Sequence, residues 1–268
     1  MRPVVAADCR NWHALTMRRI LLSLAFVSCV APPRFEAKRF EPIVADLSAF
    51  ASQHQIDMGV PGVWIALLEV DPVTGEQHLW ASTFGGAVNS AYGATSLVSA
   101  PSNLDVLATH RVASISKLYT DTAAMVLVER AVLNLDEPIK TYLPTFAPNN
   151  PFGTPVTLRS LMGHRAGMVR ESPVGHYFDA TEPSLSATVA SLNDTTLVAE
   201  PGSAYKYSNP GIGVVGEVIA QVTGKPFEDA VRELVLTPLD LRDSDFAPRA
   251  DLVERQAEGI MWTYDGRK

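Results

Sequence analysis

The chain has 268 residues, of which 47% are hydrophobic and 19% charged, and its formal net charge is −7. This composition supplies enough apolar surface for a sizeable core and excludes an intrinsically disordered chain. The acidic balance, with no run of Lys or Arg to offset it, argues against nucleic acid or an anionic membrane as the partner. The six histidines are scattered, without His-Glu-x-x-His or Cys-x-x-Cys spacing, so we expect no metal and no cofactor.

Residues 1–33 are predicted to be a leader, and the domain is predicted to follow at residues 34–268. Met17 precedes two arginines and an apolar run, residues 20–30, which has the length of a signal peptide and is too short to span a bilayer. We predict that translation starts at Met17 and that the chain is exported, to the periplasm or the exterior, with cleavage after Ala31. A second prediction is a lipid anchor, because the residues ending at Cys29 imitate a bacterial lipoprotein box. The alternative is an apolar N-terminus with no role in export.

The first elements after the leader are predicted to be a helix and a hairpin. Residues 38–54 have the apolar spacing of a helix. Residues 63–70 and 77–84 are typical of two strands joined by a turn. The Gly-, Ala- and Ser-rich residues 85–102 indicate a surface loop.

The rest of the chain is predicted to be mostly helical. Helices are expected over residues 123–133, 157–162, 186–192, 212–223 and 227–235. No second set of strand patterns follows the hairpin. Since two strands do not make an independently stable sheet, we expect the remaining strands to lie beyond residue 268.

Ser114 and Lys117 are three residues apart and lead into the helix expected at residues 123–133. At the start of a helix this spacing places both side chains on one face, one turn apart. A serine hydroxyl is a poor nucleophile until a base takes its proton, and a lysine held neutral can be that base. The helix N-terminus would favour negative charge at the serine. The alternative is a capping serine beside a solvated lysine.

Tyr207 and Asn209 lie between two Pro-Gly pairs, which predicts that both are on a loop rather than in a helix. A tyrosine near a lysine ammonium can lose its proton closer to neutral pH and act as a base. Asn209 can hydrogen-bond to an amide or ester substrate. The alternative is an ordinary turn, with Tyr207 packed on the core.

These segments resemble the serine β-lactamase and penicillin-binding-protein superfamily, of the class C β-lactamase, esterase and D-aminopeptidase type. The matching segments are residues 111–117, 133–139, 142–144, 156–162, 201–211 and 238–241. They occur in the family's order and at similar spacing between residues 40 and 246. The resemblance implies a β-lactamase/transpeptidase-like fold of the α/β (α+β) class. In that fold a helical region is inserted in an antiparallel sheet, whose C-terminal strands would be missing from this sequence.

The resemblance also implies a serine hydrolase that forms an acyl-enzyme. Ser114 would attack the carbonyl of an ester, a D-amino peptide or a β-lactam, so the implied partner is a small-molecule or peptide substrate. Lys117 and Tyr207 would share the proton transfers, and either could be the base. Asn209 would bind the amide side chain of the substrate or orient Lys117, and the Ser114 N–H would be half of the oxyanion hole. His164 is expected to satisfy a turn rather than to catalyse.

One motif of the family has no counterpart in this sequence. The family carries a Lys-Thr-Gly or His-x-Gly triplet on a strand downstream of the Tyr-x-Asn loop, and no such triplet follows Asn209. That strand supplies the second oxyanion donor, whose loss typically costs about two to three orders of magnitude in rate. We therefore interpret the sequence as part of a longer enzyme or as a truncated product. The alternative functions are a non-catalytic relative that binds peptidoglycan or a protein, and an inactive fragment.

Overall fold

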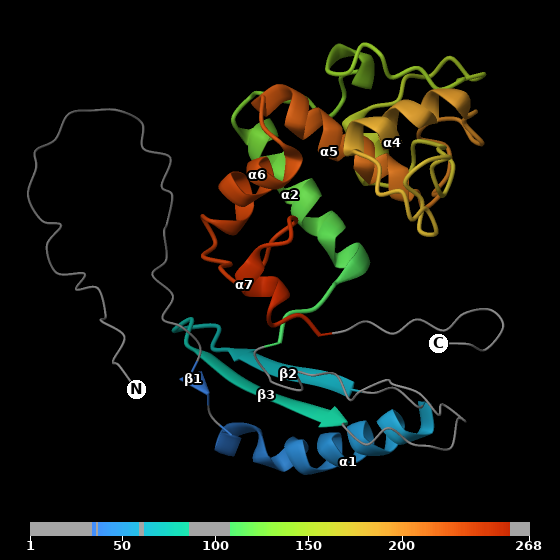
Figure 1. Cartoon of the computed structure of the whole chain (residues 1–268). Coiled ribbons are helices and arrows are strands. Elements are labelled where there is room, and N and C mark those ends of the chain that lie inside the picture. Colours follow the sequence, from blue (N-terminus) through green and yellow to red (C-terminus); the bar gives the residue numbers. More distant parts are fainter. Residues whose placement is uncertain (1–33, 36, 59–61, 86–107, 258–268) are drawn as a thin grey trace, which may run out of the picture. The chain divides into compact units, whose positions relative to one another are not determined.

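The computed structural model describes residues 34–35, 37–58, 62–85 and 108–257 (Figure 1). They belong to two compact units, one drawn from residues 1–47 and 65–81 and the other from residues 48–64 and 82–268. The predicted leader, nearly all of the loop predicted at residues 85–102, and the last eleven residues lie outside the described part. None of the helices in the described part is both long and apolar enough to cross a membrane.

A small sheet is formed by three strands in the order β1-β3-β2. The elements are β1 (Arg34–Phe35), a 3-10 turn (Ala37–Phe40), α1 (Glu41–Met58), β2 (Gly62–Val70) and β3 (Gln77–Gly85). The predicted hairpin is confirmed: β2 and β3 are joined by a turn in which the Asp71 carboxylate accepts hydrogen bonds from the N–H groups of Val73 and Thr74. β1 pairs in parallel with β3.

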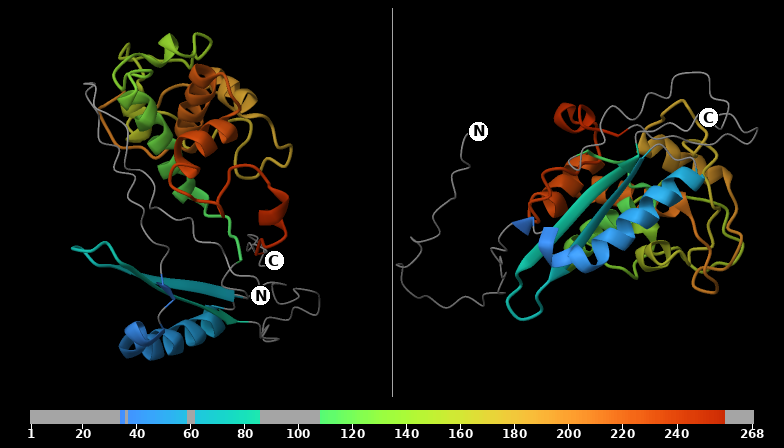
Figure 2. Two further views of the ribbon diagram at one scale, coloured as in Figure 1. Left: turned by 90° about the vertical axis from the view of Figure 1, so that its left-hand side faces the viewer. Right: turned by 90° about the horizontal axis from the view of Figure 1, so that it is seen from below.

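The helical part of the second unit is built around α5 (Figure 1, Figure 2). Its helices are α2 (Ser116–Glu129), α3 (Leu158–Met162), α4 (Leu185–Ser191), α5 (Asn209–Thr223), α6 (Phe227–Val231) and α7 (Ala250–Val253). α5 packs against α2, α3, α4 and α6. Its side chains Val214, Val215, Val218 and Ile219 are fully buried, and each contributes about 1.5–3 kcal/mol by leaving water. α5 therefore fixes both the helix that follows Ser114 and the loop that carries Tyr207.

Capping side chains define the ends of the helices that border the site. Thr157 caps α3, in a capping box with Ser160. Ser208 caps α5, where its Oγ accepts a hydrogen bond from the N–H of Gly211 at 3.1 Å. Gly224 ends α5 with a φ of +66°, a conformation that glycine adopts without strain.

Two predicted boundaries are wrong. The helix expected at residues 123–133 begins at Ser116 and ends at Glu129. It stops there because Ala131 has a φ of +57°, and the N–H groups of Val132 and Leu133 both turn back to Leu127 O. Asn209 was expected on a loop, but it is the first residue of α5. The Pro-Gly pair after it does not break the helix, because proline is well tolerated in the first helical turn.

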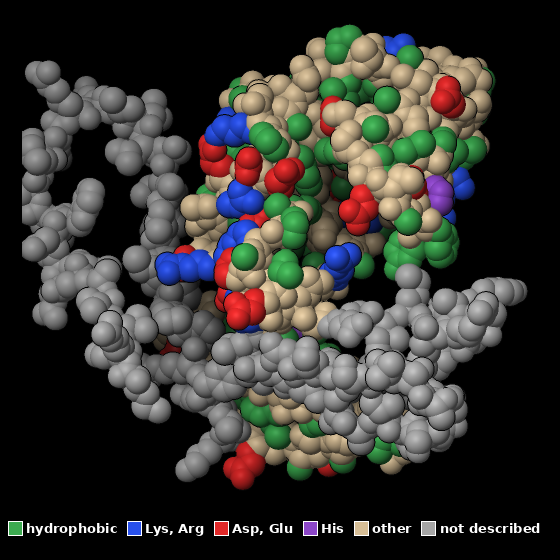
Figure 3. Space-filling view, viewed as in Figure 1, with side chains coloured by type: hydrophobic (Ala, Val, Ile, Leu, Met, Phe, Trp, Pro, Cys, Tyr) green, Lys and Arg blue, Asp and Glu red, His purple; other side chains and the backbone are tan. Residues whose placement is uncertain are grey.

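An ion pair ties the last described segment to Arg232, the residue that directly follows α6. The Asp245 side chain is only 1% exposed and lies 2.9 Å from the Arg232 guanidinium. It also accepts hydrogen bonds from the N–H groups of Phe246 and Ala247, so its charge is satisfied. On the face seen in Figure 3, Lys and Arg side chains alternate with Asp and Glu. Arg249–Asp251 and Arg255–Asp243 are two such ion pairs in the described part of the chain.

Candidate active site

The structure brings Ser114, Lys117 and Tyr207 together. Lys117 Nζ donates a hydrogen bond to Ser114 Oγ at 3.0 Å. Tyr207 Oη donates to the same oxygen at 2.8 Å, although the two residues are 93 positions apart in the chain. The two side chains that the sequence offers as candidate bases thus both contact the candidate nucleophile directly. Both distances are within the reach that proton transfer requires.

Ser114 lies on a short 3-10 turn, Ala113–Ile115, that leads directly into α2. The spacing that was expected to place Ser114 and Lys117 on one face therefore does so. Ala113, the residue before the serine, has a φ of +44°. A non-glycine residue in this region is strained, and such strain persists where the surrounding structure holds it, often beside functional groups.

Tyr207 is held in place by the segment around His164. The backbone oxygen of His164 accepts a hydrogen bond from the N–H of Lys206 at 2.7 Å. The His164 ring lies 4.3 Å from the Tyr207 ring, centre to centre, and its Nδ1 accepts a hydrogen bond from the N–H of Ser208. Burial, and then the Lys117 charge, lower the pKa of His164, so its imidazole stays neutral and can accept that bond. This geometry supports the expectation that His164 shapes a turn.

Two cations lie over the ring of Tyr207. Lys117 Nζ is 5.1 Å from the ring centre, and the Arg170 guanidinium carbon is 5.4 Å from it. Lys117 most strongly, followed by the Ser114 hydroxyl, lowers the pKa of Tyr207 below its ordinary value. The phenol of Tyr207 is therefore easier to deprotonate than that of an ordinary tyrosine, which suits a candidate base.

Asn209 lies beside the site, but its amide is directed to a residue that the sequence did not single out. Asn209 Nδ2 donates to Glu171 Oε1 at 2.7 Å. Arg170 Nε lies 3.8 Å from the same oxygen. The only sequence signal for Glu171 and Arg170 is that two neighbouring charges stand close after His164, before the helix expected at residues 186–192. Because loop charges are common, that signal alone does not identify a site.

Asp121 is a second residue that the sequence did not reveal. It lies on α2 one turn after Lys117, at the i+4 spacing that places two side chains on one face. Its Oδ1 atom is buried and accepts no hydrogen bond from the described residues. Burial raises the pKa of this carboxyl to about 6, although the Lys117 charge acts in the opposite direction. A half-buried carboxyl without a close partner is costly in its charged form.

We expect Asp121→Asn to stabilise the protein near neutral pH. An unfolded aspartate titrates near pH 4, whereas folded Asp121 titrates near 6. Between these values the folded chain binds more protons, so the free energy of unfolding falls as the pH rises and stays lower above 6. After a discount for the partial exposure of Asp121, we expect Asp121→Asn to raise the free energy of unfolding at pH 7.5 by about 1 kcal/mol. Urea unfolding at pH 4.5 and 7.5 measures it.

The control for this change is Glu129→Gln, which removes an exposed carboxylate from the same helix. It should shift stability by less than about 0.5 kcal/mol at either pH. If the free energy of unfolding changes equally with pH in Asp121→Asn and in the wild-type protein, burial does not raise the pKa of Asp121 and the prediction is wrong.

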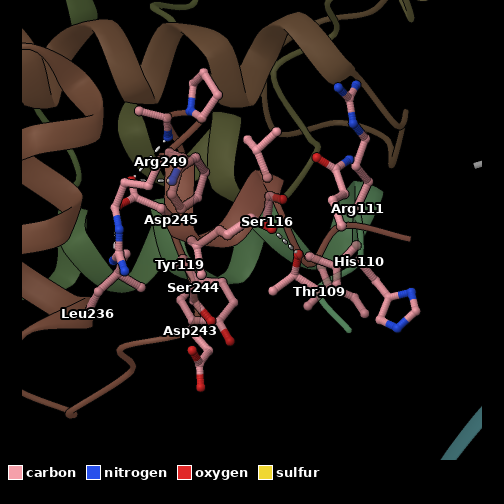
Figure 4. Close-up of a pocket in the computed structure, with 18 of the residues that line it drawn as sticks. Thr109, His110, Arg111, Ser116, Tyr119, Leu236, Asp243, Ser244, Asp245 and Arg249 are labelled. Atoms are coloured by element: carbon pink, nitrogen blue, oxygen red, sulfur yellow. Dashed lines mark hydrogen bonds and ion pairs between the residues drawn. The ribbon is translucent and has the colours of Figure 1, made fainter. Parts of the chain in front are cut away.

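A cavity near the start of α2 is not lined by the three candidate catalytic residues. It measures about 580 Å³, and its lining includes neither Ser114, Lys117 nor Tyr207. In Figure 4 its labelled residues come from the segment before α2, from α2 itself and from the segment before α7, namely Thr109, His110, Arg111, Ser116, Tyr119, Leu236, Asp243, Ser244, Asp245 and Arg249. Ser114, the candidate nucleophile, is exposed. In the described part of the chain, no group of His, Cys, Asp and Glu side chains is arranged to hold a metal ion.

Solved structures similar to this chain identify its fold class. EstCE1, a hydrolase with promiscuous acyltransferase activity, is 28% identical with a TM-score of 0.63, over 81% of this chain and 56% of that one. The D-amino acid amidase from Ochrobactrum anthropi SV3 is 25% identical with a TM-score of 0.62, over 83% and 58%. The fold is therefore β-lactamase/transpeptidase-like, as the sequence predicted.

The chain belongs to the β-lactamase family, whose model matches residues 85–267. The D-alanyl-D-alanine-carboxypeptidase/endopeptidase AmpH of Escherichia coli K12 is 30% identical over 148 residues, covering 54% of this chain and 38% of that protein. Esterase EstB of Burkholderia gladioli is 32% identical over 149 residues, covering 51% and 38%. The matches to these curated relatives thus span well under half of their length.

Proposed function

We propose that this protein is a serine hydrolase that forms an acyl-enzyme on Ser114 with an ester, a D-amino peptide or a β-lactam. The observation that carries the proposal is the pair of contacts at Ser114 Oγ, from Lys117 Nζ at 3.0 Å and from Tyr207 Oη at 2.8 Å. The similarity to an esterase, a carboxypeptidase and an amidase supports a carbonyl substrate. Esters, peptides and amides are therefore the substrate classes to compare.

In the first step we assign the base role to Tyr207. The Tyr207 phenolate takes the proton of Ser114 as Oγ bonds to the carbonyl carbon of the substrate. The tetrahedral intermediate then collapses: the bond to the leaving group breaks, and the leaving amine or alcohol takes that proton from Tyr207. Lys117 stays an ammonium, which stabilises the phenolate and the developing charge. Water, deprotonated by the same phenolate, hydrolyses the ester on Ser114.

Covalent labelling tests the proposal. A fluorophosphonate probe should label Ser114 in the wild-type protein, and Ser114→Ala should abolish labelling at the peptide that contains residue 114. Ser116→Ala is the matched control, because this serine lies two residues further on and its hydroxyl has no bond to Lys117 or Tyr207. It should be labelled as the wild-type protein is. Equal labelling of Ser114→Ala, or no labelling at all, would favour a non-catalytic relative that binds peptidoglycan or a protein.

The predicted leader supports a further proposal, that the chain is exported and meets its substrate outside the cytoplasm. Fractionation of cells expressing the full sequence, with and without residues 1–33, tests it. Retention of both forms in the cytoplasm would contradict export.

A further inference from the structure

Glu171 sets the orientation of the Asn209 side chain. Asn209 Nδ2 donates to Glu171 Oε1 at 2.7 Å. An ionised carboxylate only accepts hydrogen bonds, so the nitrogen of the amide must face it and the carbonyl oxygen Oδ1 must face away. Among the described residues, no group donates a hydrogen bond to this Oδ1. We call the Glu171 carboxylate and Asn209 Oδ1 the acceptor corner.

The charge of Glu171 is still accessible to a ligand. The neighbouring Arg170 Nε is 3.8 Å from Oε1, which is beyond hydrogen-bond distance. The side chains of Arg170 and Glu171 are 67% and 38% exposed, and such solvated pairs contribute little. The Arg170 guanidinium lies over the Tyr207 ring instead. The carboxylate therefore keeps unused acceptor positions at the edge of the site.

The acceptor corner lies beside the reacting groups. Asn209 follows Tyr207 by two residues, and Tyr207 contacts Ser114 Oγ. Asn209 and Lys117 also line one small cavity, of about 190 Å³. A substituent next to the carbonyl of a substrate bound at Ser114 is thus within reach of this corner.

We propose that Glu171 is a specificity-determining residue that selects substrates with an ammonium group next to the scissile carbonyl. This inference rests on the proposed function of Ser114. An ammonium has three N–H donors and no acceptor, so it satisfies Glu171 and Asn209 Oδ1 together. Its bond to a carboxylate is charge-assisted and stronger than a neutral one. A carboxylate or carbonyl on the substrate at the same point would meet only acceptors and be rejected.

Protection of Ser114 from the fluorophosphonate probe tests this without requiring turnover. The ligands are both enantiomers of alaninamide and, as the neutral analogue, propionamide, at pH 6.5, where an α-amino group is protonated. In the wild-type protein, one alaninamide enantiomer should half-protect Ser114 at a concentration about tenfold or more below that of propionamide. In Glu171→Gln, which keeps the size of the side chain but removes its charge, the ratio should fall below about threefold.

The matched control is Glu217→Gln. Glu217 is on α5, as Asn209 is, and its Oε1 accepts a 2.7 Å hydrogen bond from Ser186 Oγ, so the same change is made at a carboxylate that does not contact Asn209. This variant should keep the wild-type ratio. The inference would be overturned if alaninamide and propionamide protect Ser114 equally, or if neither protects it. It would also be overturned if Glu171→Gln keeps the wild-type ratio of the two half-protecting concentrations. Failure of the probe to label Ser114 is a different result, which overturns the proposed function itself.

Discussion

Tyr207→Phe should slow acylation of Ser114 by about two to four orders of magnitude. The change removes only the phenolic oxygen, which lies 2.8 Å from Ser114 Oγ, and a positioned general base typically contributes this much. The wild-type rate should rise with pH and level off above the pKa of Tyr207. That pKa lies below the ordinary value of about 10 because Lys117 and Ser114 stabilise the phenolate. Rates of fluorophosphonate labelling between pH 6 and 10 give the profile.

The control is Tyr205→Phe, which makes the same change two residues earlier in the same segment. Tyr205 is 65% exposed and its ring stands 6.0 Å from that of His164, centre to centre, so its hydroxyl should not matter to the rate. Tyr207→Phe should also lose the rising limb of the pH profile. If it is labelled as fast as the wild-type protein, the base is Lys117, and Tyr207 only orients the serine.

The parts of the fold and site that the sequence predicted rest on local signals. The hairpin was predictable because its strands are apolar and the residues between them, Pro72 to Gly75, are typical of a turn. Ser114 and Lys117 were predictable as a pair because a helix fixes the geometry of residues three apart. The contact of Tyr207 with this pair joins residues 93 positions apart, and it was predicted from the family resemblance rather than from spacing.

The residues that were missed depend on tertiary packing. Glu171 becomes part of the site only because the segment after His164 lies against the start of α5. Asp121 has an ordinary sequence context on a helix, and its unusual pKa arises from burial. The placement of Asn209 failed for a local reason: a Pro-Gly pair is typical of a turn, whereas Ser208 can also cap a helix that starts at Asn209. A serine two residues before a Pro-Gly pair is thus compatible with both structures.

Gly167→Ala should have the largest effect on stability, lowering the free energy of unfolding by about 3–5 kcal/mol. Gly167 has a φ of +69°, and a Cβ there would stand 1.8 Å from the backbone oxygen of Ala199. The two segments are held at this distance by the hydrogen bond from Val198 N–H to Gly167 O, so one of them must move. Because the same pair of segments carries the bond from Lys206 to His164 that braces Tyr207, labelling of Ser114 should slow as well.

Gly224→Ala is the control that measures the cost of the backbone strain without the clash. Its φ of +66° is nearly the same, but a Cβ there would have nothing within 4 Å. It should therefore cost only the left-handed strain of alanine, about 1–2 kcal/mol, and leave the labelling rate of Ser114 unchanged. Urea unfolding followed by circular dichroism compares the two variants. Equal destabilisation would show that the 164–171 segment can move away from Ala199, and the rigid support that we assign to Tyr207 would then be wrong.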